Sequence, residues 1–159
     1  MTEAKALASF FKRNQYLITM QAKDVTTEES LSLPPAGGNC MNWVIGHIIV
    51  HRDIALRSLG ATPILDERET EIYKRESEPL TNPEQALPLA TLVERLESSH
   101  QRLQTALEQS TPEALAHKPD PAEKRTVGEG LRLLQWHETY HAGQLELLRH
   151  MAGKHEKLI

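Results

Sequence analysis

Four long segments of this sequence carry apolar residues at intervals of three and four, the spacing that places side chains on one face of an α-helix. No segment is typical of a β-strand. Each segment would form a helix about 30 Å long, and amphipathic helices of that length bury their apolar faces by packing into a bundle. The sequence therefore predicts an all-α protein, a four-helix bundle in one domain over residues 1–159. The four predicted helices span about 3–22, 39–60, 84–109 and 126–152.

Local motifs mark several ends of these helices. Thr126 and Glu129 have the spacing of a capping box, in which the two side chains bond free backbone N–H groups at the start of a helix. Asn39 or Asn42 is expected to cap the second helix, and Gly60 stands where a glycine commonly ends one. These signals predict where the helices begin and end, but they carry no information on how the helices are arranged.

Two of the connections are long. Residues 24–38 contain two prolines and two glycines, and residues 61–83 are charged and interrupted by prolines. We expect both to be loops, the second with one short helical turn. Their lengths permit either a simple up-down order of the four helices or a crossover.

The charge balance of the chain excludes several classes of protein. The chain has 18 basic and 22 acidic side chains, a net charge of −4, whereas nucleic-acid and anionic-membrane surfaces need a basic patch. No apolar run approaches the roughly 20 residues of a membrane span, and the first 15 residues lack the pattern of a secretion signal. The single cysteine, Cys40, fits a reducing compartment. We therefore expect a cytoplasmic protein.

Histidines stand on helix faces that should be apolar. His137 and His141 are four residues apart on the last predicted helix, and His47 and His51 repeat that spacing on the second. Side chains four apart project from the same face of a helix and can share one metal ion. Burying a histidine ring without partners costs roughly 1–3 kcal/mol, so repeated burial indicates metal binding or a hydrogen-bonded network. A purely structural bundle with unmetallated histidines is the alternative.

Residues 137–141 read HETYH and match HExxH, the helical zinc motif of metallopeptidases. The longer form of that motif needs Gly at 144 and His at 147, but the chain has Gln144 and Leu147. The sequence also offers no edge strand to align a peptide. A peptidase is therefore disfavoured, and the third ligand must come from upstream, where His47 is the best-placed candidate.

Three further residues are candidates for a general base or for orienting a ligand. They are Glu138, His51 and His100. Glu138 follows its neighbouring histidine by one residue, roughly 100° around the helix, and is expected to be a solvated charge. His51 is the extra member of the second histidine pair, and His100 lies on the apolar stripe of the third helix.

Two motifs together resemble a known family. The segment from Asn42 to His47 (NWVIGH) is similar to the N-x-x-x-x-H motif of the DinB-like (DinB/YfiT) metal-binding family, and HETYHAGQ, residues 137–144, is similar to its H-x-x-x-H-R-G-Q motif. The resemblance implies a four-helix bundle that holds one divalent transition metal through His47, His137 and His141. Zinc or nickel is expected, with iron and manganese as alternatives. Ala142 departs from the arginine that is usual in the family, which removes a cation beside the site.

The resemblance also implies an activity. Family members with an assigned activity are thiol-dependent S-transferases or isomerases that use a low-molecular-weight thiol, and dimers are common among them. We therefore expect a metal-dependent transferase that acts on a small electrophile, with a small-molecule substrate, no nucleic acid or membrane partner, and a homodimer. A metal-dependent hydrolase and a non-catalytic metal-binding stress-response protein are the alternatives.

Overall fold

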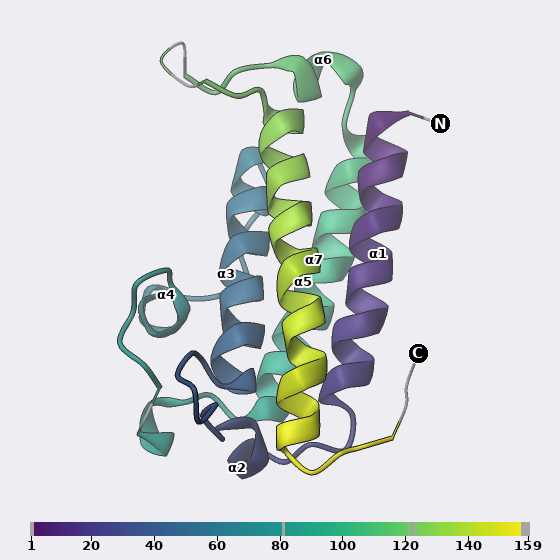
Figure 1. The fold of residues 1–159 in the computed structure, drawn as a ribbon. Coiled ribbons are helices and arrows are strands. Elements are labelled where there is room, and N and C mark those ends of the chain that lie inside the picture. Colours follow the sequence, from purple (N-terminus) through teal and green to yellow (C-terminus); the bar gives the residue numbers. More distant parts are fainter. Residues whose placement is uncertain (1, 81, 121, 123, 157–159) are drawn as a thin grey trace.

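The computed structural model describes residues 2–80, 82–120, 122 and 124–156, and every regular element in these ranges is helical (Figure 1). The all-α class is therefore confirmed. Four long helices dominate the described residues: α1 (Glu3–Ala22), α3 (Met41–Ser58), α5 (Leu89–Gln109) and α7 (Val127–Met151). Short elements lie between them: α2 (Thr27–Ser30), α4 (Glu67–Tyr73), the 3₁₀ helix η1 (Pro83–Gln85) and α6 (Pro112–Ala116). None of the described helices is both long enough and apolar enough to span a bilayer.

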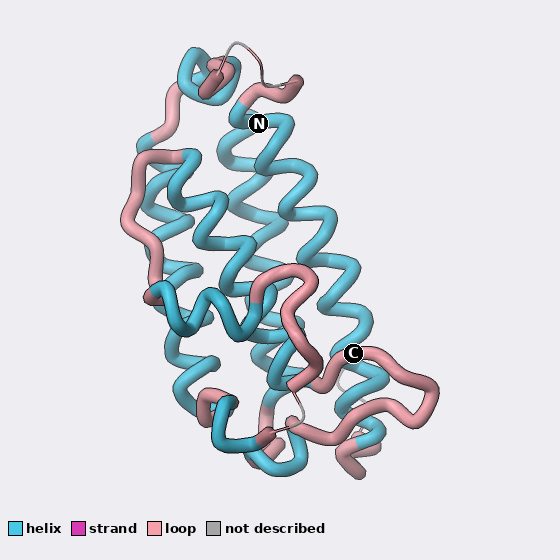
Figure 2. Tube along the Cα trace, turned by 90° about the vertical axis from the view of Figure 1, so that its left-hand side faces the viewer, coloured by secondary structure: helices cyan, strands magenta, loops and turns pink. Residues whose placement is uncertain are grey.

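The four long helices pack side by side with a crossover. Followed by colour in Figure 1, α1 and α7 run down while α3 and α5 run up. Helix α1 packs against α5 and α7, and α3 packs against the same two helices. The first two long helices are therefore diagonal to each other. The segment from α3 to α5 returns along the outside of the bundle, with α4 against α3 (Figure 2).

Most predicted helix ends agree with the structure, but two do not. The capping box of Thr126 and Glu129 is present, and α1 has the predicted bounds. Neither asparagine caps the second long helix: Cys40 occupies the cap position without a side-chain hydrogen bond, and Asn42 lies inside the first turn. The third long helix begins at Leu89 and not near residue 84, because proline disfavours helical conformation in the residue before it.

Tyr73 is one of the residues that hold the crossover segment against α3. The Tyr73 hydroxyl donates to Asn42 Oδ1 at 2.9 Å and accepts from the Leu87 N–H at 2.9 Å. The Asn42 amide donates in turn to the Leu87 carbonyl at 2.9 Å. Asn42 therefore holds the returning chain against α3 and does not serve as a helix cap. A Cβ at Gly46 would lie 2.3 Å from the Tyr73 ring, so only glycine allows this close approach.

The core has two apolar clusters with a buried polar network near them. Arg52 of α3 and Glu138 of α7 are each almost completely buried and form a two-pronged ion pair, with N···O distances of 2.8 and 2.9 Å. The Arg52 guanidinium also donates to Gln15 of α1 at 2.7 Å and to Ser99 of α5 at 3.2 Å. These contacts join all four long helices, and we call this set of four residues the Arg52–Glu138 network.

Candidate metal centre

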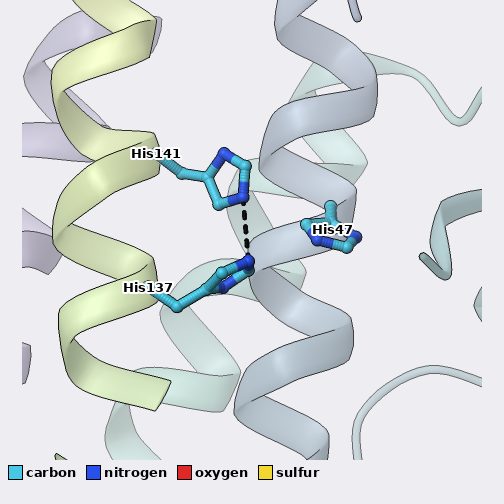
Figure 3. Close-up of side chains that lie close together, drawn as sticks. All are labelled: His47, His137 and His141. Carbon is cyan, nitrogen blue, oxygen red and sulfur yellow. Dashed lines mark hydrogen bonds between the residues drawn. The ribbon is translucent and has the colours of Figure 1, made fainter. Parts of the chain in front are cut away.

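Three histidine rings converge between α3 and α7. His47 projects from α3, and His137 and His141 project from α7 (Figure 3). Each offers one ring nitrogen, and these three nitrogens all lie within 4.8 Å of one another. His47 and His141 are buried, and His137 is partly exposed, so the cluster reaches the surface at His137. The three residues predicted as ligands are therefore brought together, and we call them the histidine cluster.

His47 is oriented by the crossover segment. Its Nδ1–H donates to the Tyr73 carbonyl at 2.8 Å, which leaves the Nε2 lone pair free. The ring also stacks on Trp43, with centroids 4.4 Å apart, and the Trp43 indole N–H donates to Ser77 at 2.9 Å. Metal-binding histidines commonly donate their second N–H to a carbonyl or carboxylate, because that bond fixes the tautomer and the ring orientation.

His141 is held in the same way by its own helix. Its Nδ1 lies 3.0 Å from Gln144 Oε1, and since an amide oxygen can only accept, Nδ1 carries the proton and Nε2 carries a lone pair. That Nε2 lies 3.1 Å from Nε2 of His137 (Figure 3). Two nitrogens bound to one tetrahedral zinc ion at about 2.05 Å would lie about 3.3 Å apart. The pair is thus near the spacing of ligands on a shared ion.

His137 has an unmet hydrogen-bonding group in either neutral tautomer. Its Nδ1 is buried and has no hydrogen-bond partner among the described residues. With the proton on Nε2, His137 can donate to His141, but Nδ1 then lacks a donor. With the proton on Nδ1, that N–H lacks an acceptor and two lone pairs face each other. A metal ion between the two Nε2 atoms removes that repulsion, so the donor set fits a cation better than it fits a closed hydrogen-bond network.

Burial keeps the cluster uncharged at neutral pH. Desolvation lowers the pKa of His47 to about 3 and that of His137 to about 4, with smaller contributions from the neighbouring histidines. Burial also lowers the pKa of His141. Neutral imidazole is the form that binds metal, so protons do not compete for these nitrogens near pH 7.

His51 lies beside the cluster without joining it. Its ring centroid is 4.1 Å from that of His137 and 4.4 Å from that of His47. Its Nδ1–H donates to the His47 carbonyl at 3.1 Å, and burial lowers its pKa. The group of mutually close nitrogens contains the other three histidines only, among the residues that the structure describes. His51 therefore lies next to the cluster as a neighbour of two of its rings.

The other two candidates lie elsewhere. Glu138 is not a solvated charge, as the sequence predicted, because α7 turns it into the core, where both carboxylate oxygens accept from Arg52. Its oxygens are thus unavailable as a general base at the cluster. His100 is half-buried on α5 near Arg52 and Glu138, and burial lowers its pKa.

Three residues that support the site were given no role from the sequence. Tyr73 and Gln144 orient two of the histidines, and Arg52 binds the glutamate beside the third. Two signals were available: Gln144 is the last residue of the HETYHAGQ motif, and Gly46, directly before His47 in an apolar helix pattern, indicates close approach of another chain segment. The partners of Tyr73 and Arg52 depend on the tertiary fold and have no local signal.

A comparison with solved structures agrees with this fold. The structure is similar to the crystal structure of a conserved protein from Enterococcus faecalis, with a TM-score of 0.75 and 19% sequence identity over 96% of this chain and 98% of that one. No curated protein matches the sequence.

The fold and the cluster define a class of protein: a helical bundle with three histidines from two helices close enough to bind one metal ion. The family follows from the sequence. The model of the DinB superfamily matches residues 11–145, most of the chain, and the protein belongs to that superfamily.

Proposed function

We propose that this protein binds one divalent transition metal through His47, His137 and His141. The observation that carries the proposal is the convergence of three neutral ring nitrogens within 4.8 Å of one another, from two helices joined by the bundle. Tyr73 and Gln144 hold two of these rings in the tautomer that a metal needs. We propose zinc or nickel, as expected from the sequence. Imidazole ligands also suit iron and copper, so the three histidines alone do not determine which metal is bound.

We further propose a metal-dependent thiol S-transferase that acts on a small electrophile in the cytoplasm. A divalent ion bound by three neutral histidines lowers the pKa of a thiol or water in an open position. The protein residues would orient that group and the substrate. His51 has a free Nε2 beside the cluster and is suited to accept a proton from the thiol.

The family resemblance supports the use of a thiol cosubstrate. One difference from the family, at Ala142, indicates that an anionic thiol or substrate would be bound by a different cation. Ala142 is buried and takes the place of the usual arginine. Arg75, on the crossover segment, supplies a positive charge near these rings: burial is the main cause of the lowered pKa of His51 and of His137, and the charge of Arg75 makes a smaller contribution to both. Arg75 is largely exposed, with its Nε 3.5 Å from the exposed carboxylate of Glu76, and its guanidinium is suited to bind an anionic group on a thiol or substrate in place of that weak surface pair.

Elemental analysis tests the metal. Protein purified without an affinity tag should contain about one transition metal ion per chain, as expected for a single three-histidine site. His47→Ala should lose the metal as completely as His141→Ala. His155→Ala is the matched control, since this exposed histidine lies outside the cluster, and it should retain the metal. Full metal occupancy in His47→Ala would show that the proposed ligand set is wrong.

A turnover assay tests the activity. The metal-loaded protein should consume small electrophiles such as epoxides or aryl halides only when a low-molecular-weight thiol is present. Equal turnover with water alone would indicate a hydrolase. Absence of turnover with every thiol and electrophile, in protein that retains its metal, would instead support a non-catalytic metal-binding protein.

A further inference from the structure

Residues 74–77, directly after α4, form a tight turn beside the histidine cluster. The Ser77 N–H donates to the Lys74 carbonyl at 3.2 Å and closes the turn. Glu76, the third of the four residues, has a φ of 64°, in the left-handed region. In turns with a positive φ at the third residue alone, such as type II, glycine or asparagine usually occupies that place. We call Lys74, Arg75, Glu76 and Ser77 the Arg75 turn.

The side chain of Glu76 does not account for this backbone conformation. Glu76 is 82% exposed, and its carboxylate makes a weak ion pair with the neighbouring Arg75 at 3.5 Å. A positive φ is uncommon for any residue other than glycine. Such conformations persist where the surrounding structure holds them, and they gather at binding sites. The contacts that hold the Arg75 turn therefore bear on its function.

The outer side of the Arg75 turn is open. Lys74, Glu76 and Ser77 line a surface cavity of about 680 Å³, together with residues of α4 and of the segment that follows the turn. Packing from that side therefore does not set the position of the turn. The contacts on its inner side, toward α3, are the ones that hold it.

On the inner side, Ser77 bonds the tryptophan that stacks on His47. The Trp43 indole N–H donates to Ser77 Oγ at 2.9 Å, and the Ser77 hydroxyl donates to the Ile72 carbonyl at 2.9 Å. The Trp43 ring is nearly parallel to that of His47, with 17° between their planes and 4.4 Å between their centroids. The next residue after Ile72, Tyr73, accepts the His47 Nδ1–H at its carbonyl. One short segment thus holds His47 twice, directly through a backbone carbonyl and indirectly through Trp43.

The same turn carries a cation beside the cluster. Burial lowers the pKa of His51 and of His137, and the charge of Arg75 adds to the lowering of both. The guanidinium therefore lies near these two rings. The Arg75 turn connects His47, at its Ser77 end, with the cation that is suited to bind an anionic group.

We propose, on the basis of the metal site proposed above, that the Arg75 turn couples the position of His47 to the position of Arg75. Ser77 and Trp43 act as positioning residues. When the His47 ring is fixed by an ion at Nε2, the stacked Trp43 ring keeps its place and its N–H holds Ser77. Metal binding therefore orders the turn. Since coupling between binding equilibria is reciprocal, a disturbed turn weakens metal binding.

Two substitutions at Glu76 test the turn without altering His47 or Trp43. Both remove the same exposed carboxylate, but glycine adopts a positive φ freely, whereas a β-branched valine strongly disfavours it. Calorimetric titration with zinc should give a dissociation constant for Glu76→Val that is about threefold or more above that of Glu76→Gly, a smaller effect than the loss of a direct partner of a ligand. Equal zinc affinity in the two variants would overturn the proposal.

A double-mutant cycle tests the bond between Ser77 and Trp43. Ser77→Ala removes the acceptor, and Trp43→Phe keeps a ring to stack on His47 but lacks the N–H. Each should weaken zinc binding by about three- to tenfold, and the double variant should lose no more than either single one, because both remove the same bond. Ser110→Ala is the matched control, a half-buried serine at the end of α5 whose hydroxyl also donates to a backbone carbonyl. It should bind zinc like wild type.

Two outcomes of the cycle would contradict the proposal. Additive losses in the double variant would show that the two residues act separately. Unchanged zinc affinity in Ser77→Ala would show that the turn does not support His47. In the metal-free protein, the Trp43 indole N–H should exchange with solvent more slowly than that of Trp136, which is 62% exposed, and Ser77→Ala should remove this protection.

Hydrogen exchange measured by NMR separates the coupling from the proposed metal site. Zinc should slow exchange of the Ser77 backbone N–H by about tenfold or more in the wild-type protein, because local opening of the turn becomes rarer. The effect should be smaller in Trp43→Phe. Zinc binding without slower exchange at Ser77 would overturn the coupling and leave the metal site intact. Absence of zinc binding would overturn both.

Discussion

Helices α3 and α7 carry two polar clusters next to each other, and the two clusters differ in how completely they are bonded. In the Arg52–Glu138 network every guanidinium nitrogen has an acceptor and both carboxylate oxygens have a donor. In the histidine cluster, where His137 directly precedes Glu138 on α7, the Nδ1 of His137 has no partner among the described residues and two Nε2 atoms face each other.

This difference separates a structural role from a binding role. Buried polar groups are almost always hydrogen-bonded, and an unmet group costs free energy. The charged groups of the network are hydrogen-bonded within the protein, so the network requires no ligand. The histidine cluster retains free lone pairs that converge on one point, which is the arrangement expected of residues that bind a ligand.

Breaking the network should have the largest effect on folding. Glu138→Gln leaves the Arg52 charge buried with a neutral partner, and should lower the free energy of unfolding by about 3–5 kcal/mol, the usual cost of removing one member of a buried ion pair. Urea unfolding of the metal-free protein measures this. His137→Leu, at the neighbouring position, removes an unmet polar group and should leave stability within about 1 kcal/mol of wild type or above it. If the two variants were equally destabilised, the contrast between the clusters would be wrong.

Removing the support of one ligand should have an intermediate effect. Gln144→Leu eliminates the acceptor that orients His141, and should weaken metal binding by about 10–100-fold, the range found when residues behind a metal ligand are replaced. Calorimetric titration with zinc measures the affinity. Gln135→Leu is the matched control, because Gln135 is on the same helix but bonds Thr139 near α1. It should bind zinc like wild type, and an equal loss in both variants would mean that Gln144 does not support the ligand.

Acid should have a gradual effect on stability. The pKa values of His47 and His137 are about 3 and 4 in the folded protein, against an ordinary value of 6.5. Between these values the unfolded chain binds more protons, so the stability of the metal-free protein is fully present above pH 6.5 and falls as the pH is lowered toward 4. Thermal unfolding across this range measures the slope, and His137→Leu should reduce it. An unchanged slope in that variant would show that His137 does not titrate as described.

The sequence predicted the helices well, because period and capping are local properties. Thr126 and Glu129 act through contacts within one helical turn. His137 and His141 could be paired for the same reason, since residues four apart share a face of a helix. His47 was the best-placed candidate for the third ligand, and the family resemblance supported it, but its distance from the other two depends on how α3 packs against α7 and could not be predicted.

The predictions that failed concern long-range contacts. Glu138 was expected in solvent, but its partner Arg52 is 86 positions away in the sequence, and nothing local marks the pair. Asn42 was expected to cap a helix, yet it bonds Tyr73 of the returning chain. That contact helps to hold the returning segment against α3, and the lengths of the connections alone could not predict the crossover.

The most direct test of the account is a crystal structure of the zinc-loaded protein with anomalous scattering measured at the zinc edge. We predict one zinc ion per chain, bound by Nε2 of His47, His137 and His141 at about 2.0–2.1 Å, with the Tyr73 and Gln144 hydrogen bonds retained. An ion held without His47, or no anomalous peak between these rings at saturating zinc, would contradict the central claim that the three histidines form a metal site.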